Sequence, residues 1–294
     1  MAEPAFIGID WGTSSFRAYL ADDEGRALDA LAHGEGALAL KPGEHEAYLA
    51  RRLAGWPKLP VFACGMVGAK QGWREAAYVA CPAGLPEIAA ALLSVPTSFG
   101  PVRIVPGARS SDARGMPDVM RGEETQLLGA LAAGCGDGVY VLPGTHSKWA
   151  RVEGGRILGF ETFMTGETFA VLKDHSVLGR MMAAPAPGGG FAGGVDAASG
   201  LERPGDLLHA MFAARTFGLF ETLPADQLGE YLSGLLIGAE IVAGAAGVAK
   251  ATAIGSAGLT AHYVEAGARL GVTIAPAPEN CALLGLAALR RAAS

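Results

Sequence analysis

Cysteine is scarce in this sequence, and no two of the four cysteines form a CxxC pair. Their dispersal argues against a zinc site or a thioredoxin-like motif. Aromatic residues contribute only 7 % of the chain, so close packing must come mainly from small side chains. Basic charge is also limited: the net charge is −6 and no basic stripe is present. Neither nucleic acid nor an anionic membrane is therefore an expected partner.

Long apolar runs are missing as well. The most apolar stretch, residues 232–248, is rich in Gly and Ala and contains Glu240, so it predicts a buried helix rather than a membrane span. No basic and apolar leader precedes the first strand-like run, and we expect a cytoplasmic protein. The P-loop pattern GxxxxGK followed by Ser or Thr is absent, as is a GxGxxG that opens a helix after the first strand.

A repeated pattern is the most informative feature that is present. An apolar run ending in an acid, residues 5–10, is followed by Gly12-Thr13-Ser14-Ser15 and by two further strand-like runs, 16–20 and 26–31. The same order starts again near residue 138 and contains Gly144-Thr145-His146-Ser147. Two Gly-Thr-x-Ser turns in one Gly-rich chain could coincide by chance. Placed between strands in both halves, they favour a duplication and two similar lobes.

Glycine turns of this type suit phosphate binding. Without a Cβ, the backbone N–H groups can converge on phosphate oxygens, and the Thr and Ser hydroxyls add donors. Phosphoryl transfer depends largely on such positioning and on stabilisation of charge. A third glycine turn, within residues 251–259, could approach a nucleoside closely.

Two further helices are predicted, over residues 122–133 and 280–291. Glu123 and Glu124 fall in the first turn of the former. They can be read as complements of the helix dipole, or as catalytic carboxylates, because the helix leads into the second glycine turn. The Pro- and Gly-rich residues 185–194 predict a mobile surface loop.

Longer motifs carry a resemblance to a known family. They are Ile9-Asp10-Trp11-Gly12, Gly65-Met66-Val67-Gly68 with Gly72-Trp73, residues 120–129, residues 143–149, Thr165-Gly166-Glu167 and residues 232–240. Together they resemble the 2-dehydro-3-deoxygalactonokinases of the actin–hexokinase–heat-shock ATPase superfamily. The resemblance implies an α/β, two-lobed actin-like ATPase (ribonuclease H-like) fold with an ATP cleft between the lobes.

From this resemblance we expect an N-terminal lobe, residues 1–134, and a C-terminal lobe, residues 135–294, whose last helix could return to the hinge. The implied reaction is phosphorylation of the 6-hydroxyl of 2-dehydro-3-deoxy-D-galactonate in galactonate catabolism, with ATP and Mg²⁺ as cofactors. The partners would be the sugar acid and ATP, and a homodimer is left open.

Site residues follow from the same resemblance, position by position. Asp10 would hold Mg²⁺ and Lys148 would neutralise transition-state charge. Contacts to ATP would come from Gly12, Thr13, Ser14, Gly144, Thr145, His146, Ser147, Gly255, Ser256 and Gly258. Contacts to the substrate would come from Met66, Gly68, Trp73 and Glu167.

Several alternatives stay open. The general base would be Glu123 or Glu124, with Asp112 and Asp118 as rivals. The substrate carboxylate calls for a cation, and the candidates are Arg17, Arg109, Arg114 and Arg121. A phosphoanhydride hydrolase on the same fold is an alternative function, and so is a kinase of the gluconate-derived epimer.

Overall fold

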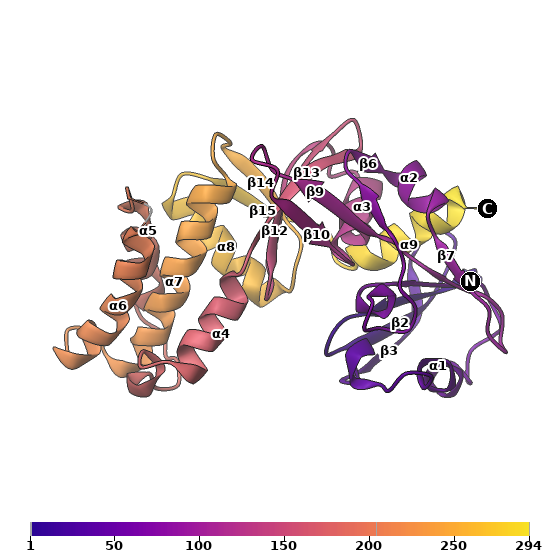
Figure 1. The fold of residues 1–294 in the computed structure, drawn as a ribbon, viewed down its shortest axis with the longest axis horizontal. Helices are drawn as coiled ribbons and strands as arrows, with labels where there is room; N and C mark the ends of the chain where they lie inside the picture. Colours follow the sequence, from indigo (N-terminus) through magenta and orange to yellow (C-terminus); the bar gives the residue numbers. More distant parts are fainter. Residues whose placement is uncertain (1, 204, 294) are drawn as a thin grey trace. The chain divides into compact units, whose positions relative to one another are not determined.

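The computed structural model describes residues 2–203 and 205–293 (Figure 1). Contacts within the chain divide it into two compact units. Unit 1 consists of Met1–Asp137, Ala150–Phe160 and Ala277–Ser294, and unit 2 consists of Gly138–Trp149 and Glu161–Pro276. No helix in the described ranges is long and apolar enough to cross a membrane.

Unit 1 is built on a mixed sheet with the strand order β3-β2-β1-β4-β8-β7. β1 pairs antiparallel with β2 and parallel with β4. Ile7, Ile9 and Trp11 of β1 enter one core cluster and Phe6 enters another, as the two-residue period of a strand requires. The strands are Phe6–Trp11 (β1), Phe16–Ala21 (β2), Ala27–His33 (β3), Val61–Cys64 (β4), Leu93–Val95 (β7) and Val102–Ile104 (β8).

The C-terminal helix belongs to unit 1, where α9 packs against α3 with the two backbones in close approach. A Cβ on Gly129 would lie 1.8 Å from the Cys281 carbonyl oxygen, and one on Gly285 would lie 2.0 Å from that of Thr125. Only glycine fits at either position. The helices of unit 1 are Ala37–Ala39 (η1), His45–Arg52 (α1), Met66–Gly68 (η2), Leu85–Ala90 (α2), Glu123–Ala132 (α3) and Cys281–Ala292 (α9). Its remaining strands are Tyr78–Ala80 (β5), Ala83–Gly84 (β6), Gly107–Ser111 (β9) and Pro117–Met120 (β10).

A second large sheet has the order β15-β14-β11-β12-β13-β6. Its strands β11, β12 and β13 are consecutive in the chain and adjacent in the sheet, as β1, β2 and β3 are in the first sheet. β14 pairs parallel with β11, as β4 pairs parallel with β1. Both Gly-Thr-x-Ser turns thus join equivalent strands, as the repeated pattern predicts. These strands are Gly138–Leu142 (β11), Ser147–Glu153 (β12), Arg156–Phe163 (β13), Lys250–Ala253 (β14) and Thr273–Pro276 (β15).

Helices make up most of the rest of unit 2. α5 and α7 approach closely where each helix carries a glycine. A Cβ on Gly194 would lie 2.0 Å from the Tyr231 carbonyl oxygen, and a Cβ on Gly234 would lie 2.0 Å from the Phe191 carbonyl oxygen, so larger residues would push the helices apart. The helices are Thr165–His175 (α4), Gly179–Met181 (η3), Gly190–Ser199 (α5), Asp206–Leu219 (α6), Ala225–Gly244 (α7) and Ala257–Arg269 (α8).

One expectation differs from the structure, and a second concerns the division of the chain. The loop predicted over residues 185–194 is wrong from Gly190 onward, because α5 starts there and buries Phe191 and Gly194 against α7. The expected division at residues 134 and 135 leaves open that the last helix returns to the hinge, and in the structure the contacts of α9 with α3 group Ala277–Ser294 with unit 1. Both findings depend on close contacts between helices that are far apart in the sequence.

Candidate active site

The first glycine hairpin joins β1 to β2 in unit 1. The Gly12 N–H donates to the Ser15 carbonyl oxygen at 2.9 Å, which closes the turn, and Thr13 and Ser14 are exposed. Gly36 supports the turn from behind, since a Cβ there would lie 1.9 Å from the Thr13 carbonyl oxygen. The hairpin therefore offers two hydroxyls on a supported backbone, an arrangement suited to binding an anion.

Asp10 lies beside this hairpin and opposite Arg17 of β2. Arg17 Nη1 is 3.9 Å from Asp10 Oδ2, and the Asp10 side chain is 22 % exposed. Burial raises the pKa of Asp10, Arg17 opposes that shift, and the negative charge of Glu123 raises the pKa further. The exposed Arg17 thus acts as a counter-charge to Asp10, and an additional cation would relieve the repulsion between the two acids.

Glu123 and Glu124 open α3 but have different surroundings. α3 follows Gly122, whose φ of +108° favours glycine. Glu123 is partly exposed and its Oε2 accepts from the Arg121 backbone N–H at 2.9 Å. Glu124 is fully buried, with the Gly122 N–H donating to Oε2 (2.7 Å) and the Thr125 hydroxyl to Oε1 (2.8 Å). Glu123 is therefore accessible to a substrate, whereas Glu124 holds the turn in place.

The burial of Glu124 makes stability depend on pH. Burial, and secondly the charge of Glu123, raises the pKa of Glu124 from 4.5 to about 7. The folded chain therefore binds more protons than the unfolded chain between these values, and stability falls as the pH rises from about 4.5 to about 7. This fall in the free energy of unfolding is about 3 kcal/mol for such a shift.

We expect Glu124→Gln to remove the fall, because the amide does not titrate in this range. Urea denaturation of the wild-type protein and of Glu124→Gln, each at about pH 5 and about pH 8, measures the change in the free energy of unfolding. Equal pH dependence of the two proteins would contradict the assignment.

Arg121 has the most unusual surroundings among the four candidate arginines. It is 9 % exposed, Nη2 donates to the Ala76 carbonyl oxygen at 2.8 Å, and the guanidinium lies 4.3 Å above the centre of the Tyr78 ring. Nε and Nη1 are buried without a hydrogen-bond partner. A buried cation with two unused donors is costly unless an anion pairs with it. Arg121 is thus well suited to receive a carboxylate.

The other candidate arginines are less suited to that role. Arg109 is exposed on β9, opposite Val119 of β10. Arg114 is exposed and pairs with Asp112 at 2.9 Å. Asp112 in turn has its pKa lowered, first by the Met116 backbone N–H and also by Arg114. A lowered pKa weakens Asp112 as a base, and this disfavours one of the rivals to Glu123.

The predicted substrate residues 66–73 surround η2. A Cβ on Gly68 would lie 3.0 Å from Arg121 Nη1, so Gly68 borders the unpaired side of the guanidinium. Met66 is partly buried against the unit 1 core, and Trp73 belongs to that core. The Trp73 ring lies nearly parallel to His45, with ring centres 6.3 Å apart. Gly68 is therefore placed beside Arg121, while Trp73 has a packing role in the core.

The second glycine hairpin joins β11 to β12 in unit 2. Thr145 and His146 are exposed, whereas Ser147 and Lys148 are buried, and Lys148 Nζ donates to the His146 carbonyl oxygen at 3.1 Å. His146 Nε2 also contacts Glu167 of α4. Gly166 permits this approach, because a Cβ there would lie 2.5 Å from the Gly144 carbonyl oxygen. The predicted residues 144–148 and Glu167 are thus brought together.

A buried carboxylate that the sequence reasoning did not assign supports this hairpin. Glu240 of α7 accepts from Trp149 Nε1 at 2.8 Å and from the Tyr263 hydroxyl at 2.7 Å. Tyr263 Oη is in turn 3.0 Å from Ser147 Oγ, which accepts from the Gly144 N–H at 3.3 Å. Tyr263 donates its proton to Glu240, so the Ser147 hydroxyl, which also bonds Glu240, is the donor in its contact with Tyr263. The signal in the sequence was a single acid within the apolar residues 232–248.

The third glycine turn follows β14. Gly255, Ser256 and Gly258 are exposed at the start of α8, and Ile254 N–H donates to the Val141 carbonyl oxygen at 2.9 Å. Nothing lies within 4 Å of a Cβ built on Gly258. The turn is thus anchored to β11 and leaves open space at Gly258.

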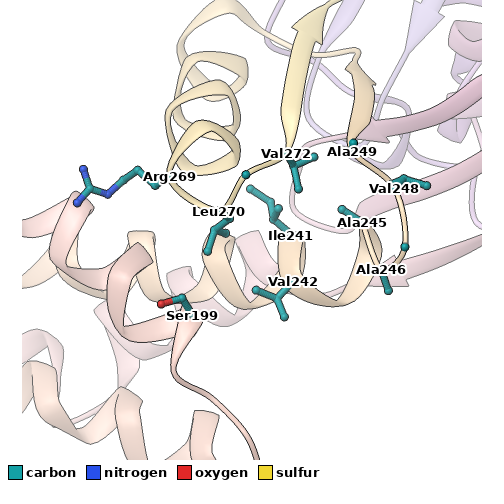
Figure 2. A pocket seen from close by; sticks show the side chains of 12 residues that line it. Ser199, Ile241, Val242, Ala245, Ala246, Val248, Ala249, Arg269, Leu270 and Val272 are labelled. Carbon is teal, nitrogen blue, oxygen red and sulfur yellow. The ribbon is translucent and has the colours of Figure 1, made fainter.

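A pocket of about 700 Å³ in unit 2 includes none of the predicted site residues. Figure 2 shows its apolar wall, formed by the end of α7 and the turn between α8 and β15. The Arg269 side chain extends away from that wall and pairs with Asp196 at 2.6 Å. The pocket therefore offers no unpaired charge for an ionic substrate.

Asp10 and Glu123 are the carboxylates beside the first hairpin that could bind Mg²⁺. In the part of the chain that the structure describes, no three His, Cys, Asp or Glu side chains form a metal-binding group. Mg²⁺ commonly uses one or two carboxylates and takes its other ligands from phosphate oxygens and water. Burial is the main cause of the raised pKa of Asp10, with Arg17 opposing it, and a cation bound at Asp10 would stabilise the buried carboxylate in its charged form. The residues present therefore fit this ion.

The repeated strand order with a glycine hairpin after each first strand defines the class: a two-lobed, actin-like ATPase fold. Component A of the (R)-2-hydroxyglutaryl-CoA dehydratase of Acidaminococcus fermentans matches this fold with a TM-score of 0.51 at 14 % identity, over 99 % of this chain and 100 % of that one. The model of the 2-keto-3-deoxy-galactonokinase family matches residues 10–289, and the chain belongs to that family.

Individual relatives agree with this membership. A 2-dehydro-3-deoxygalactonokinase of Escherichia coli is 36 % identical, over 92 % of this chain and 91 % of the relative. A Rhizobium meliloti protein provisionally given the same name is 40 % identical, over 98 % and 97 %. A crystal structure of a Sinorhizobium meliloti protein with that provisional name superposes with a TM-score of 0.88 at 37 % identity, covering 98 % of both chains.

Proposed function

We propose that the chain transfers the γ-phosphoryl group of ATP to the 6-hydroxyl of 2-dehydro-3-deoxy-D-galactonate, with Mg²⁺ as the accompanying ion. Membership of the family makes the chain a 2-dehydro-3-deoxygalactonate kinase of galactonate catabolism, and therefore a phosphotransferase. The observation that carries the residue-level proposal is the position of Asp10 on β1 beside the first glycine hairpin, where its carboxylate is largely buried and close enough to Glu123 to feel the charge of that acid.

Residues of both units are proposed to bind ATP. Gly12, Thr13 and Ser14 would contact the phosphates from unit 1, and residues 144–147 from unit 2. Gly255, Ser256 and Gly258 would contact the nucleoside. Because Ser147 donates to Tyr263, the exposed Thr145 and His146 are better placed than Ser147 to meet a phosphate. Asp10 would hold Mg²⁺, which neutralises phosphate charge when it is bound with ATP.

Glu123 is proposed as the general base. The acceptor hydroxyl must lose its proton during transfer, and a partly exposed carboxylate at the start of α3 can accept it. Glu124 is a positioning residue in this proposal, because its two oxygens are engaged by Gly122 and Thr125. Lys148 would stabilise developing charge, and Arg121 would bind the substrate carboxylate beside Gly68.

A coupled ADP-release assay tests the proposed reaction. We expect ADP release that depends on 2-dehydro-3-deoxy-D-galactonate, with ³¹P NMR showing the phosphate on O6. Glu123→Gln should lower kcat by roughly 100-fold, the lower end of what one acid–base group contributes. Phosphate release without the sugar acid would instead indicate a phosphoanhydride hydrolase. Faster turnover of the gluconate-derived epimer would reassign the substrate.

Glu240→Gln is expected to weaken ATP binding through the second hairpin. A Gln amide keeps one acceptor oxygen and replaces the other with an NH2 group, so at least one of the donors to Glu240, which include Trp149 and Tyr263, loses its acceptor. We expect KM for ATP to rise roughly 5- to 10-fold, as for a lost hydrogen bond of about 1 kcal/mol, with KM for the sugar acid unchanged.

The matched variant for this prediction is Tyr263→Phe. The double variant with Glu240→Gln should raise KM for ATP less than the product of the single effects, because both changes interrupt one network. Equal effects on the KM values of both substrates would show a general loss of structure instead.

The partners are the sugar acid and ATP. We also propose that the kinase assembles as a homodimer, since α6 exposes a row of large apolar side chains.

A further inference from the structure

Helix α6 of unit 2 is apolar around most of its circumference. Among its fourteen residues, Asp206–Leu219, the polar side chains are confined to Asp206, His209, Arg215 and Thr216. One side of the helix packs into the helical core of unit 2 through Leu207, Met211, Ala214 and Phe217. A helix that is hydrophobic all round is normally buried on all sides.

The other side of α6 is exposed. Leu208 is 72 % exposed, Phe212 52 % and Leu219 53 %. Their spacing of four and seven residues places them on one stripe of an α-helix. Phe220, 75 % exposed, is the C-cap residue that follows Leu219, so it borders the stripe at the end of the helix without sharing its spacing. Helix α6 lies at the outer edge of the unit 2 helices in Figure 1. We propose that the stripe together with the bordering residue, Leu208, Phe212, Leu219 and Phe220 and called the stripe below, is the interface between two copies of this chain.

The exposed area matches what a stable dimer requires. With side chains of about 150–250 Å² each, the four residues leave roughly 500 Å² of apolar surface in water. A standard interface buries about 800 Å² per partner, and about 65 % of a homodimer interface is apolar. The exposed apolar area of the stripe is therefore about equal to the apolar area that one partner contributes to such an interface.

The charges around the stripe favour a second copy as the occupant. Arg215, the basic residue between Phe212 and Leu219, donates to the Val177 carbonyl oxygen at 3.2 Å, and Asp206 pairs with Arg203 at 2.7 Å. The stripe thus carries little net charge and can meet its own copy across a two-fold axis near Phe212, with the α6 helices antiparallel. An anionic membrane surface would be attracted by a cluster of unpaired basic residues, whereas Arg203 beside the stripe is paired with Asp206.

Size-exclusion chromatography with light scattering on the full chain tests this inference. At about 50 µM we expect wild-type protein at twice the chain mass of 29.9 kDa. Phe212→Glu and Leu208→Glu, tested separately, should both shift it to the mass of one chain, because each would bury an unpaired charge in the interface. Both side chains are exposed in the single chain, so neither substitution should disturb its fold. The circular dichroism spectrum should match that of wild type, and kinase turnover should remain within about two-fold of wild type.

Leu28→Glu is the matched control. It adds the same charge at a 41 % exposed leucine of β3 in unit 1 and should leave the dimer intact. A monomeric wild-type protein, or a dimer that persists in both α6 variants, would overturn the inference. Neither result bears on the proposed reaction, because sugar-acid-dependent ADP release is measured independently of mass.

Discussion

Asp10→Asn is expected to lower kcat by roughly 100- to 1000-fold, the range for removing one group that stabilises transition-state charge. The amide has almost the same shape as the carboxylate but lacks the charge that would hold Mg²⁺. The variant should remain folded, because burial, the main cause of the raised pKa of Asp10, favours a neutral side chain at this position. Steady-state rates across a Mg²⁺ titration measure the effect, and half-maximal activity should require more Mg²⁺ than in wild type.

Asp112→Asn is the control for this experiment. Asp112 pairs with Arg114 in a turn, and its pKa is lowered, first by the Met116 N–H, so we expect its replacement to change kcat by less than about three-fold. Wild-type kinetics in Asp10→Asn would remove Asp10 from the metal site. A large loss in Asp112→Asn would instead transfer the role of base to Asp112.

Arg121→Gln is expected to raise KM for the sugar acid by roughly 100-fold, because a buried charge pair that loses one partner costs about 2–5 kcal/mol. The two unused donors, Nε and Nη1, are the groups that would pair with the substrate carboxylate. KM for ATP should change by less than two-fold. Initial-rate kinetics with each substrate varied in turn separate these effects.

An analogue with a primary amide in place of the carboxylate makes the test specific. Wild type should bind this analogue roughly 100-fold more weakly than the acid, whereas Arg121→Gln should hardly distinguish them. Arg109→Gln, at an exposed arginine of β9, should behave as wild type. Full discrimination between acid and amide in Arg121→Gln would assign the carboxylate to another cation.

Much of the site could be predicted because it depends on short segments. An apolar strand, a Gly-Thr-x-Ser turn and a second strand are local features, so the hairpins at residues 12–15 and 144–147 and the start of α3 appear where the sequence indicates them. The choice between Glu123 and Glu124 could not be made in this way. Neighbouring residues on a helix face different directions, and burial separates the two only after α3 has packed.

The sequence by itself determined the family, the repeated strand order and the glycine turns, because these rest on local pattern and residue type. Tertiary structure alone decided that Arg121 is the candidate arginine buried with two unpaired donors, that Glu240 reaches Tyr263 and Trp149, and that α9 joins unit 1 through Gly129 and Gly285. Each of these depends on contacts between distant segments. Burial and hydrogen-bond direction arise only when such segments pack together.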